Sequence, residues 1–186
     1  MGAGSGLTGL GEVNRRIVDM RLRKMDTTQH TLDIDASQII AQKEAAKYTY
    51  KGEQGYMPMV GHLAQAGVVL HEQFRQGNVA LASANLEFIQ DCQAAMPQGH
   101  QIKRLRADSA TYQADIFNYL DDEGIEFAIG GRCSESVKTA VQNIVESEWK
   151  KFADCAIAEI VHAMGETRAR LSSCRCASPD ADGTLR

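Results

Sequence analysis

Apolar residues recur along the chain with two different spacings, and these spacings predict its elements. Alternating or short continuous apolar runs predict strands at 31–37, 55–64, 67–78, 102–109 and 125–131. Helical spacing predicts helices at 83–96, 111–124 and 134–145, with Ser134 as a suitable N-cap for the last. The predicted order is therefore βββαβαβα.

Three consecutive strands favour an antiparallel meander, whereas strands that are reached through helices favour parallel pairing. The order therefore predicts an α/β fold with a mixed sheet, of the ribonuclease-H-like type and incomplete at its C-terminal end. We expect this core to occupy residues 31–168.

Both ends of the chain differ from this predicted core. Residues 1–30 are expected to be a Gly-rich lead-in with one short amphipathic helix, whose apolar face would hold Val13, Ile17, Val18, Met20 and Leu22. Residues 169–186 lack apolar periodicity, so they are expected to be disordered.

Composition narrows the possible partners only slightly. The 20 basic and 24 acidic residues give a net charge of -4, so no overall positive field indicates a nucleic-acid partner. Basic residues cluster at 15–24 and 103–106, where they could contact phosphates or simply form solvated faces. No apolar run approaches the roughly 18–20 residues that span a bilayer, and the N-terminus does not resemble a signal peptide. We expect a cytoplasmic protein without a membrane partner.

Three aspartates are the strongest candidates for chemistry. Asp33 and Asp35 stand two apart in a predicted strand, which puts both side chains on one face. Asp108 follows the strand predicted at 102–109, at the end where open α/β sheets gather ligands. Carboxylates in such a place suit Mg²⁺ or Mn²⁺, although aspartate at a strand end also serves as a turn former or helix cap.

Several strings resemble the catalytic region of DDE transposases encoded by bacterial insertion sequences. They are LDIDAS, GYMPM, FRQGN and RADSATYQADIFNYL, and the likeness covers about residues 7–168. The resemblance implies that Asp35 and Asp108 are catalytic and bind Mg²⁺ or Mn²⁺, with Asp33 as a supporting neighbour. It implies DNA as the partner, at element ends and target, with possible self-association or binding to full-length transposase.

Two arginines within the resembling strings are further candidates. Arg106 stands two residues before Asp108, where it could contact a DNA phosphate or be a surface cation. Arg75 belongs to FRQGN, which is interpreted first as a turn formed by Gly77 and second as a DNA contact.

The chain also departs from the family pattern. Family members carry a third carboxylate in a YxxRxxxE motif, whereas no tyrosine follows Tyr119 here. The third carboxylate is therefore expected to be missing, and the chain to be an inactive fragment, truncated at both ends and possibly frameshifted in its tail.

Two alternatives remain open. The string DIDAS also resembles the signature of haloacid-dehalogenase-type phosphatases, with Asp33 as nucleophile and Asp35 as acid/base. Ser37 stands where that signature prefers Thr or Val, and the preceding segment offers only Leu32 as an apolar residue. The other alternative is a non-catalytic remnant that binds DNA or a transposase.

Overall fold

The computed structural model describes residues 3–131, 134–153, 155–162 and 171–177. The chain forms two compact units, residues 1–130 and residues 131–186. The core expected at 31–168 is thus divided in the structure at the end of its last predicted sheet strand.

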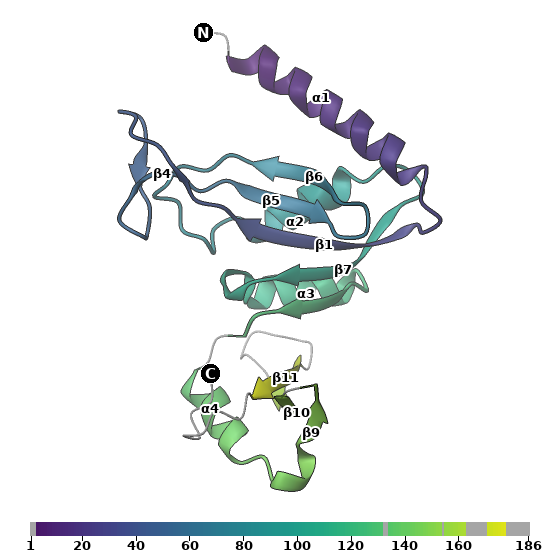
Figure 1. Cartoon of the computed structure of the whole chain (residues 1–186), viewed down its shortest axis with the longest axis vertical. Helices are drawn as coiled ribbons and strands as arrows, with labels where there is room; N and C mark the ends of the chain where they lie inside the picture. Colours follow the sequence, from purple (N-terminus) through teal and green to yellow (C-terminus); the bar gives the residue numbers. More distant parts are fainter. Residues whose placement is uncertain (1–2, 132–133, 154, 163–170, 178–186) are drawn as a thin grey trace. The chain divides into compact units, whose positions relative to one another are not determined.

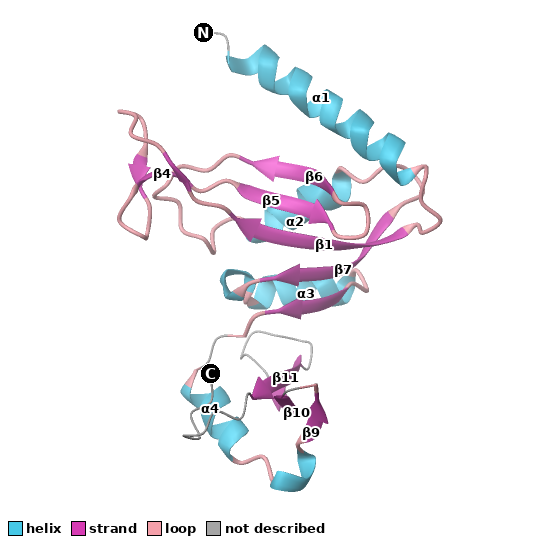
Figure 2. Ribbon diagram, in the orientation of Figure 1, coloured by secondary structure: helices cyan, strands magenta, loops and turns pink. Residues whose placement is uncertain are grey.

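A five-stranded mixed sheet forms the centre of the first unit (Figures 1 and 2). Its strands, in spatial order, are β6 (Val68–Gln73), β5 (Met59–Leu63), β1 (Gln29–Ala36), β7 (Gln101–Ala107) and β8 (Glu126–Ile129). Strands β1, β5 and β6, the first three of this sheet along the chain, pair antiparallel, and β1, β7 and β8 pair parallel. This is the predicted ribonuclease-H-like sheet, and the fold prediction is confirmed.

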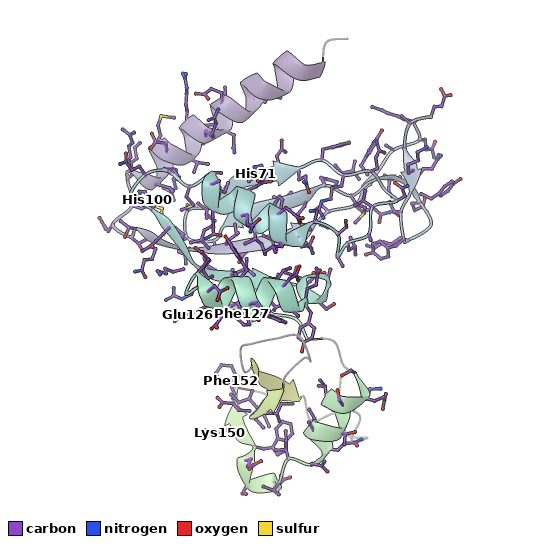
Figure 3. The ribbon with its side chains drawn as sticks, turned by 180° about the vertical axis from the view of Figure 1, so that it is seen from behind. His71, His100, Glu126, Phe127, Lys150 and Phe152 are labelled. Atoms are coloured by element: carbon purple, nitrogen blue, oxygen red, sulfur yellow. The ribbon has the colours of Figure 1, made fainter. Side chains whose placement is uncertain are left out.

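Helices α2 (Asn85–Ala94) and α3 (Ala114–Asp122) cover one face of this sheet, as Figures 1 and 3 show from opposite sides. A Cβ added at Gly61 of β5 would lie 2.7 Å from Cys92 Sγ, so α2 packs directly on that strand. On β8, Phe127 faces α3, with its ring centroid 5.1 Å from that of Phe117 (Figure 3). The buried core combines residues of the sheet and of these two helices with Val18 and Leu22 from the N-terminal helix.

Charged side chains lie on the opposite face of β1, β7 and β8. Side chains alternate along each strand, so the register that puts Leu32 beside Leu105 on the helical side puts Asp33 beside Arg106 on the other. Arg104 of β7 forms an ion pair with Glu126 of β8 across this face, at 3.1 Å. The face that carries the candidate aspartates is therefore polar.

A second, small sheet follows β1 and was not predicted. It consists of β2 (Ile39–Ile40), β3 (Lys47–Tyr48) and β4 (Gln54–Tyr56), in the order β2-β4-β3. A Cβ at Gly77 would lie 2.3 Å from the carbonyl oxygen of Lys47 and 2.6 Å from that of Gly55. Gly77 therefore allows a close approach of two backbones, and it also lies in the turn that the sequence suggested, in which the Val79 backbone N–H donates to the carbonyl oxygen of Gln76 at 3.1 Å.

Helix α1 (Ala3–Leu22) is longer than the short helix expected there. Of its expected apolar face only Val18 and Leu22 are buried, whereas Val13, Ile17 and Met20 are exposed. The reason is that α1 meets the sheet through its C-terminal half, where Asn14 Nδ2 donates to the carbonyl oxygen of Val69 at 3.0 Å.

The second unit contains helix α4 (Glu135–Gln142) and a three-stranded antiparallel sheet. The hydroxyl of Ser134 accepts from the Val137 backbone N–H at 3.4 Å, as expected of an N-cap. The strands β9 (Lys150–Phe152), β10 (Cys155–His162) and β11 (Leu171–Ala177) follow in spatial order β11-β10-β9, and Figure 3 labels Lys150 and Phe152 of β9.

Strand β11 lies within the tail that was expected to be disordered. Its backbone pairs with β10 along its whole length, from Leu171 beside His162 to Ala177 beside Ala156. Backbone pairing needs no apolar periodicity, and periodicity was the signal used for the tail. The remaining tail residues, 169–170 and 178–186, lie outside the described part of the chain.

Candidate functional site

Asp35 and Asp108 lie at the same end of two adjacent parallel strands. The register of β1 and β7 ends with Ile34 beside Ala107, so the next residues along the two strands are Asp35 and Asp108. Both side chains are exposed. Parallel neighbours lie about 4.8 Å apart in a sheet, which brings these two carboxylates to one place, as the sequence indicated.

The Asp108 carboxylate is already engaged on one side. Its Oδ1 accepts from the Ala110 backbone N–H at 3.0 Å, which caps the 3-10 helix η1 (Ser109–Thr111). The Gly130 backbone N–H, at the end of β8, donates to the carbonyl oxygen of Ala107 at 3.0 Å. A Cβ at Gly130 would lie 3.1 Å from the Ser109 nitrogen, so β8 supports the turn closely.

Two amide side chains hold the same turn from the helical side. Asn85, which is buried at the start of α2, directs Nδ2 toward the carbonyl oxygen of Ala110 at 3.4 Å. Gln113 Nε2 donates to the same oxygen at 3.1 Å and to that of Ala82 at 2.9 Å. The sequence did not single out either residue, because a polar residue near a helix start is ordinary.

Arg75 belongs to this support and is not placed for a DNA phosphate. Its side chain is buried, and its guanidinium donates to Gln73 Oε1 at 2.6 Å and to Asn85 Oδ1 at 3.2 Å. It also donates to the carbonyl oxygens of Ser83 at 2.9 Å and Ala84 at 3.3 Å. Four of the five N–H donors of Arg75 are used inside the fold, which disfavours the interpretation of Arg75 as a phosphate contact.

Asp33 and Arg106 form an ion pair on the sheet face that also carries Asp35. Arg106 Nε and Nη2 donate to the two carboxylate oxygens of Asp33, each at 2.6 Å. The hydrogen bond and the charge of Asp33 both raise the pKa of Arg106, which therefore stays protonated. Asp33 thus fixes the guanidinium of Arg106, which stands two residues before Asp108 in the chain.

The donor set at this end of the sheet fits a hard cation only in part. Mg²⁺ and Mn²⁺ prefer carboxylate oxygens and keep several waters, and Asp35 and Asp108 offer such oxygens side by side. Within the described part of the chain, no group of three or more His, Cys, Asp or Glu side chains could hold a metal ion. At this end of the sheet the described residues offer two carboxylates, those of Asp35 and Asp108.

A family model matches most of the chain. The family is described as Transposase DDE domain group 1, and its model matches residues 5–170. The chain belongs to this family. The resemblance drawn from LDIDAS and RADSATYQADIFNYL is thereby confirmed, and Asp35 and Asp108 of this DDE domain stand in those two strings.

Solved structures with a similar fold include an integrase and two transposases. The catalytic core of BIV integrase is 18% identical with a TM-score of 0.33, and the match covers 61% of this DDE domain and 62% of that chain. The piggyBac transposase synaptic complex with hairpin DNA is 9% identical with a TM-score of 0.46. The match covers 84% of this DDE domain and 34% of that chain. The Mos1 mariner paired end complex with Mn is 13% identical with a TM-score of 0.39. The match covers 63% of this DDE domain and 40% of that chain.

These likenesses are remote, and this DDE domain spans less than two thirds of each of those chains. The comparison with curated proteins gives no match. Among the helices that the structure describes, none is long and apolar enough to cross a membrane.

Family membership and geometry both disfavour the phosphatase alternative. A phosphatase of that type would use Asp33 as the nucleophile, but both oxygens of Asp33 accept hydrogen bonds from Arg106. A carboxylate held in this way is a poor nucleophile, because its lone pairs are engaged by a cation.

Proposed function

We propose that this DDE domain binds a divalent metal ion through Asp35 and Asp108, next to bound transposon DNA, as part of a polynucleotidyl-transfer site. The observation that carries the proposal is the register of β1 and β7, which sets the two aspartates side by side at the ends of parallel strands. Membership of the transposase DDE family supplies the reaction class.

When bound, Mg²⁺ or Mn²⁺ in such a site activates a water or a 3′-hydroxyl and stabilises the leaving oxygen of a phosphodiester. The protein residues have separate tasks. Asp35 and Asp108 provide the oxygen ligands, and the Ala110 N–H fixes the Asp108 carboxylate, which leaves Oδ2 for a ligand. Arg106 donates to both oxygens of Asp33, so it would contact a phosphate of the bound strand only in competition with that carboxylate.

We further propose that the chain alone binds metal and DNA without cutting DNA. Two carboxylates can place one ion, but a two-metal site needs a further anchor. The described residues supply no group of three ligands, and the sequence lacks the YxxRxxxE motif that resemblance to the family leads one to expect.

A titration of Mn²⁺ into the purified chain, beside a nicking assay on element-end DNA, tests both parts of the proposal. Two ligands should give a dissociation constant near millimolar, or about -4 kcal/mol. Asp35→Ala and Asp108→Ala should each abolish binding, whereas Asp121→Ala, an exposed carboxylate on α3, should not change it.

Two results would count against the proposal. Binding of Mn²⁺ that persists in both Asp35→Ala and Asp108→Ala would remove the site. Asp35-dependent nicking by the unmodified chain would show that another side chain completes the site and that the chain is active.

A further inference from the structure

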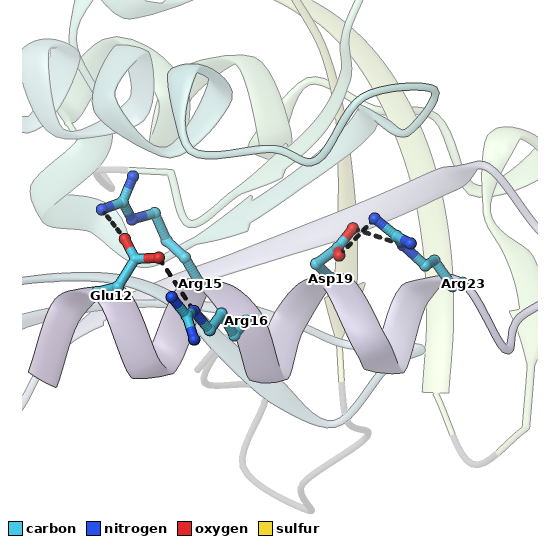
Figure 4. A network of polar contacts seen from close by, with 5 residues as sticks. All are labelled: Glu12, Arg15, Arg16, Asp19 and Arg23. Atoms are coloured by element: carbon cyan, nitrogen blue, oxygen red, sulfur yellow. Dashed lines mark hydrogen bonds and ion pairs between the residues drawn. The ribbon is translucent and has the colours of Figure 1, made fainter.

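Five of the eight basic residues at 15–24 and 103–106 are already paired with carboxylates within the fold. On α1, Arg15 and Arg16 pair with Glu12, and Arg23 pairs with Asp19 (Figure 4). On the main sheet, Arg104 pairs with Glu126 and Arg106 with Asp33. A phosphate must compete with a carboxylate at each of these positions, so we searched for basic residues without such a partner.

Unpaired lysines and exposed tyrosines occur together in residues 47–51, the sequence KYTYK, which we call the tyrosine hairpin. Lys47 and Lys51 are exposed, and neither forms an ion pair with any described residue. Tyr48 and Tyr50 are each 66% exposed, which is unusual for such large rings in a folded unit. Lys51 Nζ lies 5.5 Å from the Tyr50 ring centroid.

Thr49 holds the tyrosine hairpin in shape through hydrogen bonds of its side chain and its backbone. Its side chain is buried, and its hydroxyl accepts from Gln38 Nε2 at 2.9 Å. Its backbone N–H donates to the carbonyl oxygen of Glu53 at 2.8 Å, and Gly52, with a φ of 82°, closes the turn. With Thr49 facing inward, the tyrosines on either side of it face outward, and their exposure does not come from an unfolded loop.

The tyrosine hairpin lies near the end of β1 that carries Asp35. Gln38, which holds Thr49, is only three residues after Asp35 in the chain. In Figure 1 the small sheet around β4 lies beyond the C-terminal end of β1, on the side toward which β1 and β7 both run. A strand of DNA at Asp35 and Asp108 would therefore extend toward the tyrosine hairpin.

We propose that the tyrosine hairpin binds unpaired bases of a DNA strand next to the site, with Tyr48 and Tyr50 stacking on bases and Lys47 and Lys51 contacting phosphates. Aromatic rings flanked by lysines are suited to this task, because every base has a face on which a ring can stack. In duplex DNA the base faces are covered by their neighbours, which favours a single-stranded or frayed segment. This inference rests on the proposed function, since it gives that site its DNA partner.

Fluorescence anisotropy of the full chain with a labelled single-stranded oligothymidine and with a blunt duplex tests the proposal. The unmodified chain should bind the single strand more tightly than the duplex. Tyr48→Ala and Tyr50→Ala should each weaken single-strand binding by roughly 5- to 150-fold, the range found for a lost stacking partner. Tyr48→Phe and Tyr50→Phe keep a ring and should restore most of the binding.

The contribution of Lys47 and Lys51 is tested through the salt dependence of single-strand binding. Removing both Lys47 and Lys51 should reduce the slope of log affinity against log salt by about 1.4, or about 0.7 for each phosphate contact. The matched control, Arg15→Ala with Arg16→Ala on α1, removes the same charge from a paired site and should leave the slope unchanged. Circular dichroism of each variant should be that of the unmodified chain.

The outcomes separate this proposal from the proposed function. The hairpin proposal is overturned if folded Tyr48→Ala and Tyr50→Ala variants bind the single strand like the unmodified chain, if the α1 control reduces the slope equally, or if the chain binds no DNA. Loss of Mn²⁺ binding is not expected in any hairpin variant. Mn²⁺ binding that is independent of Asp35 and Asp108 overturns the metal site alone.

Discussion

Arg75 illustrates how one residue can be misinterpreted from its neighbours in sequence. The buried guanidinium donates to four oxygens, and its removal takes a hydrogen bond from each of them, although the Ala84 carbonyl oxygen still accepts from the Phe88 backbone N–H. Arg75→Ala should therefore lower the free energy of unfolding by about 2–4 kcal/mol, measured by urea denaturation. Arg15→Ala, at an exposed ion pair on α1, should change it by about 0.5 kcal/mol or less. A stable Arg75→Ala variant with weakened DNA binding would restore the phosphate interpretation.

His30 should make stability depend on pH. Its ring is fully buried, Nε2 lies 3.0 Å from His100 Nδ1, and Nδ1 has no hydrogen-bond partner. Burial first, and the nearby His100 second, lower the pKa of His30 from its ordinary value of 6.5. Below about pH 6.5 the unfolded chain therefore takes up a proton that the folded chain does not.

The stabilisation by neutral His30 is thus complete above about pH 6.5 and is lost as the pH falls from there toward the lowered pKa. The loss is at most about 1.4 kcal/mol per pH unit for one proton. Urea denaturation at pH 7.5 and pH 5.5 measures it. His30→Gln keeps a side-chain amide that can hydrogen-bond with His100 but does not titrate, so its loss should be smaller. Equal losses in both proteins would exclude His30 as the cause.

At the scale of elements, the sequence predicted the parts of the fold that apolar spacing controls. The five strands of the main sheet, α2, α3 and the Ser134 cap were all expected, because each buries a periodic face or uses a specific cap. The small sheet was missed because its strands are two or three residues long, too short for a period to be seen.

The candidate site, like the fold, was predicted from the sequence only in part. The adjacency of Asp35 and Asp108 followed from strand order, but the engagement of Asp33 by Arg106 and of Arg75 by Asn85 depends on side chains that meet across strands and loops. Contacts between residues 73 positions apart, as in the Asp33–Arg106 pair, leave no local signal in one sequence.

The end of β8 should control the geometry of the site through Gly130. Gly130→Ala places a Cβ about 3.1 Å from the Ser109 nitrogen and 3.4 Å from the Asp108 carbonyl carbon, so the turn that carries Asp108 must shift. Mn²⁺ affinity should fall roughly tenfold, as it does when the support of a metal ligand is disturbed. Gly11→Ala on α1 meets nothing within 4 Å and should leave Mn²⁺ affinity unchanged. Unchanged affinity in Gly130→Ala would show that the turn tolerates the shift.

At the scale of the molecule, the charged part of the sheet face bears on stability. The face opposite α2 and α3 carries the Asp33–Arg106 and Arg104–Glu126 ion pairs, which tolerate water. The first unit has its own buried core, to which Val18 and Leu22 of α1 contribute.

This division of the chain leads to a test of where the site resides. Asp35, Asp108, the tyrosine hairpin and the Arg75 support all belong to residues 1–130. A chain ending at Gly130 should unfold cooperatively in urea and should bind Mn²⁺ with nearly the affinity of the full chain, in a manner abolished by Asp35→Ala.

The opposite result would be equally informative. If residues 1–130 fold but do not bind Mn²⁺ while the full chain does, then the second unit must supply a ligand. The carboxylates to test there are Glu146, Glu148 and Glu159, none of which matches the family motif in sequence. Loss of Mn²⁺ binding in the full chain on changing one of them to Gln would identify the third ligand, and the expectation of an inactive chain would then have to be abandoned.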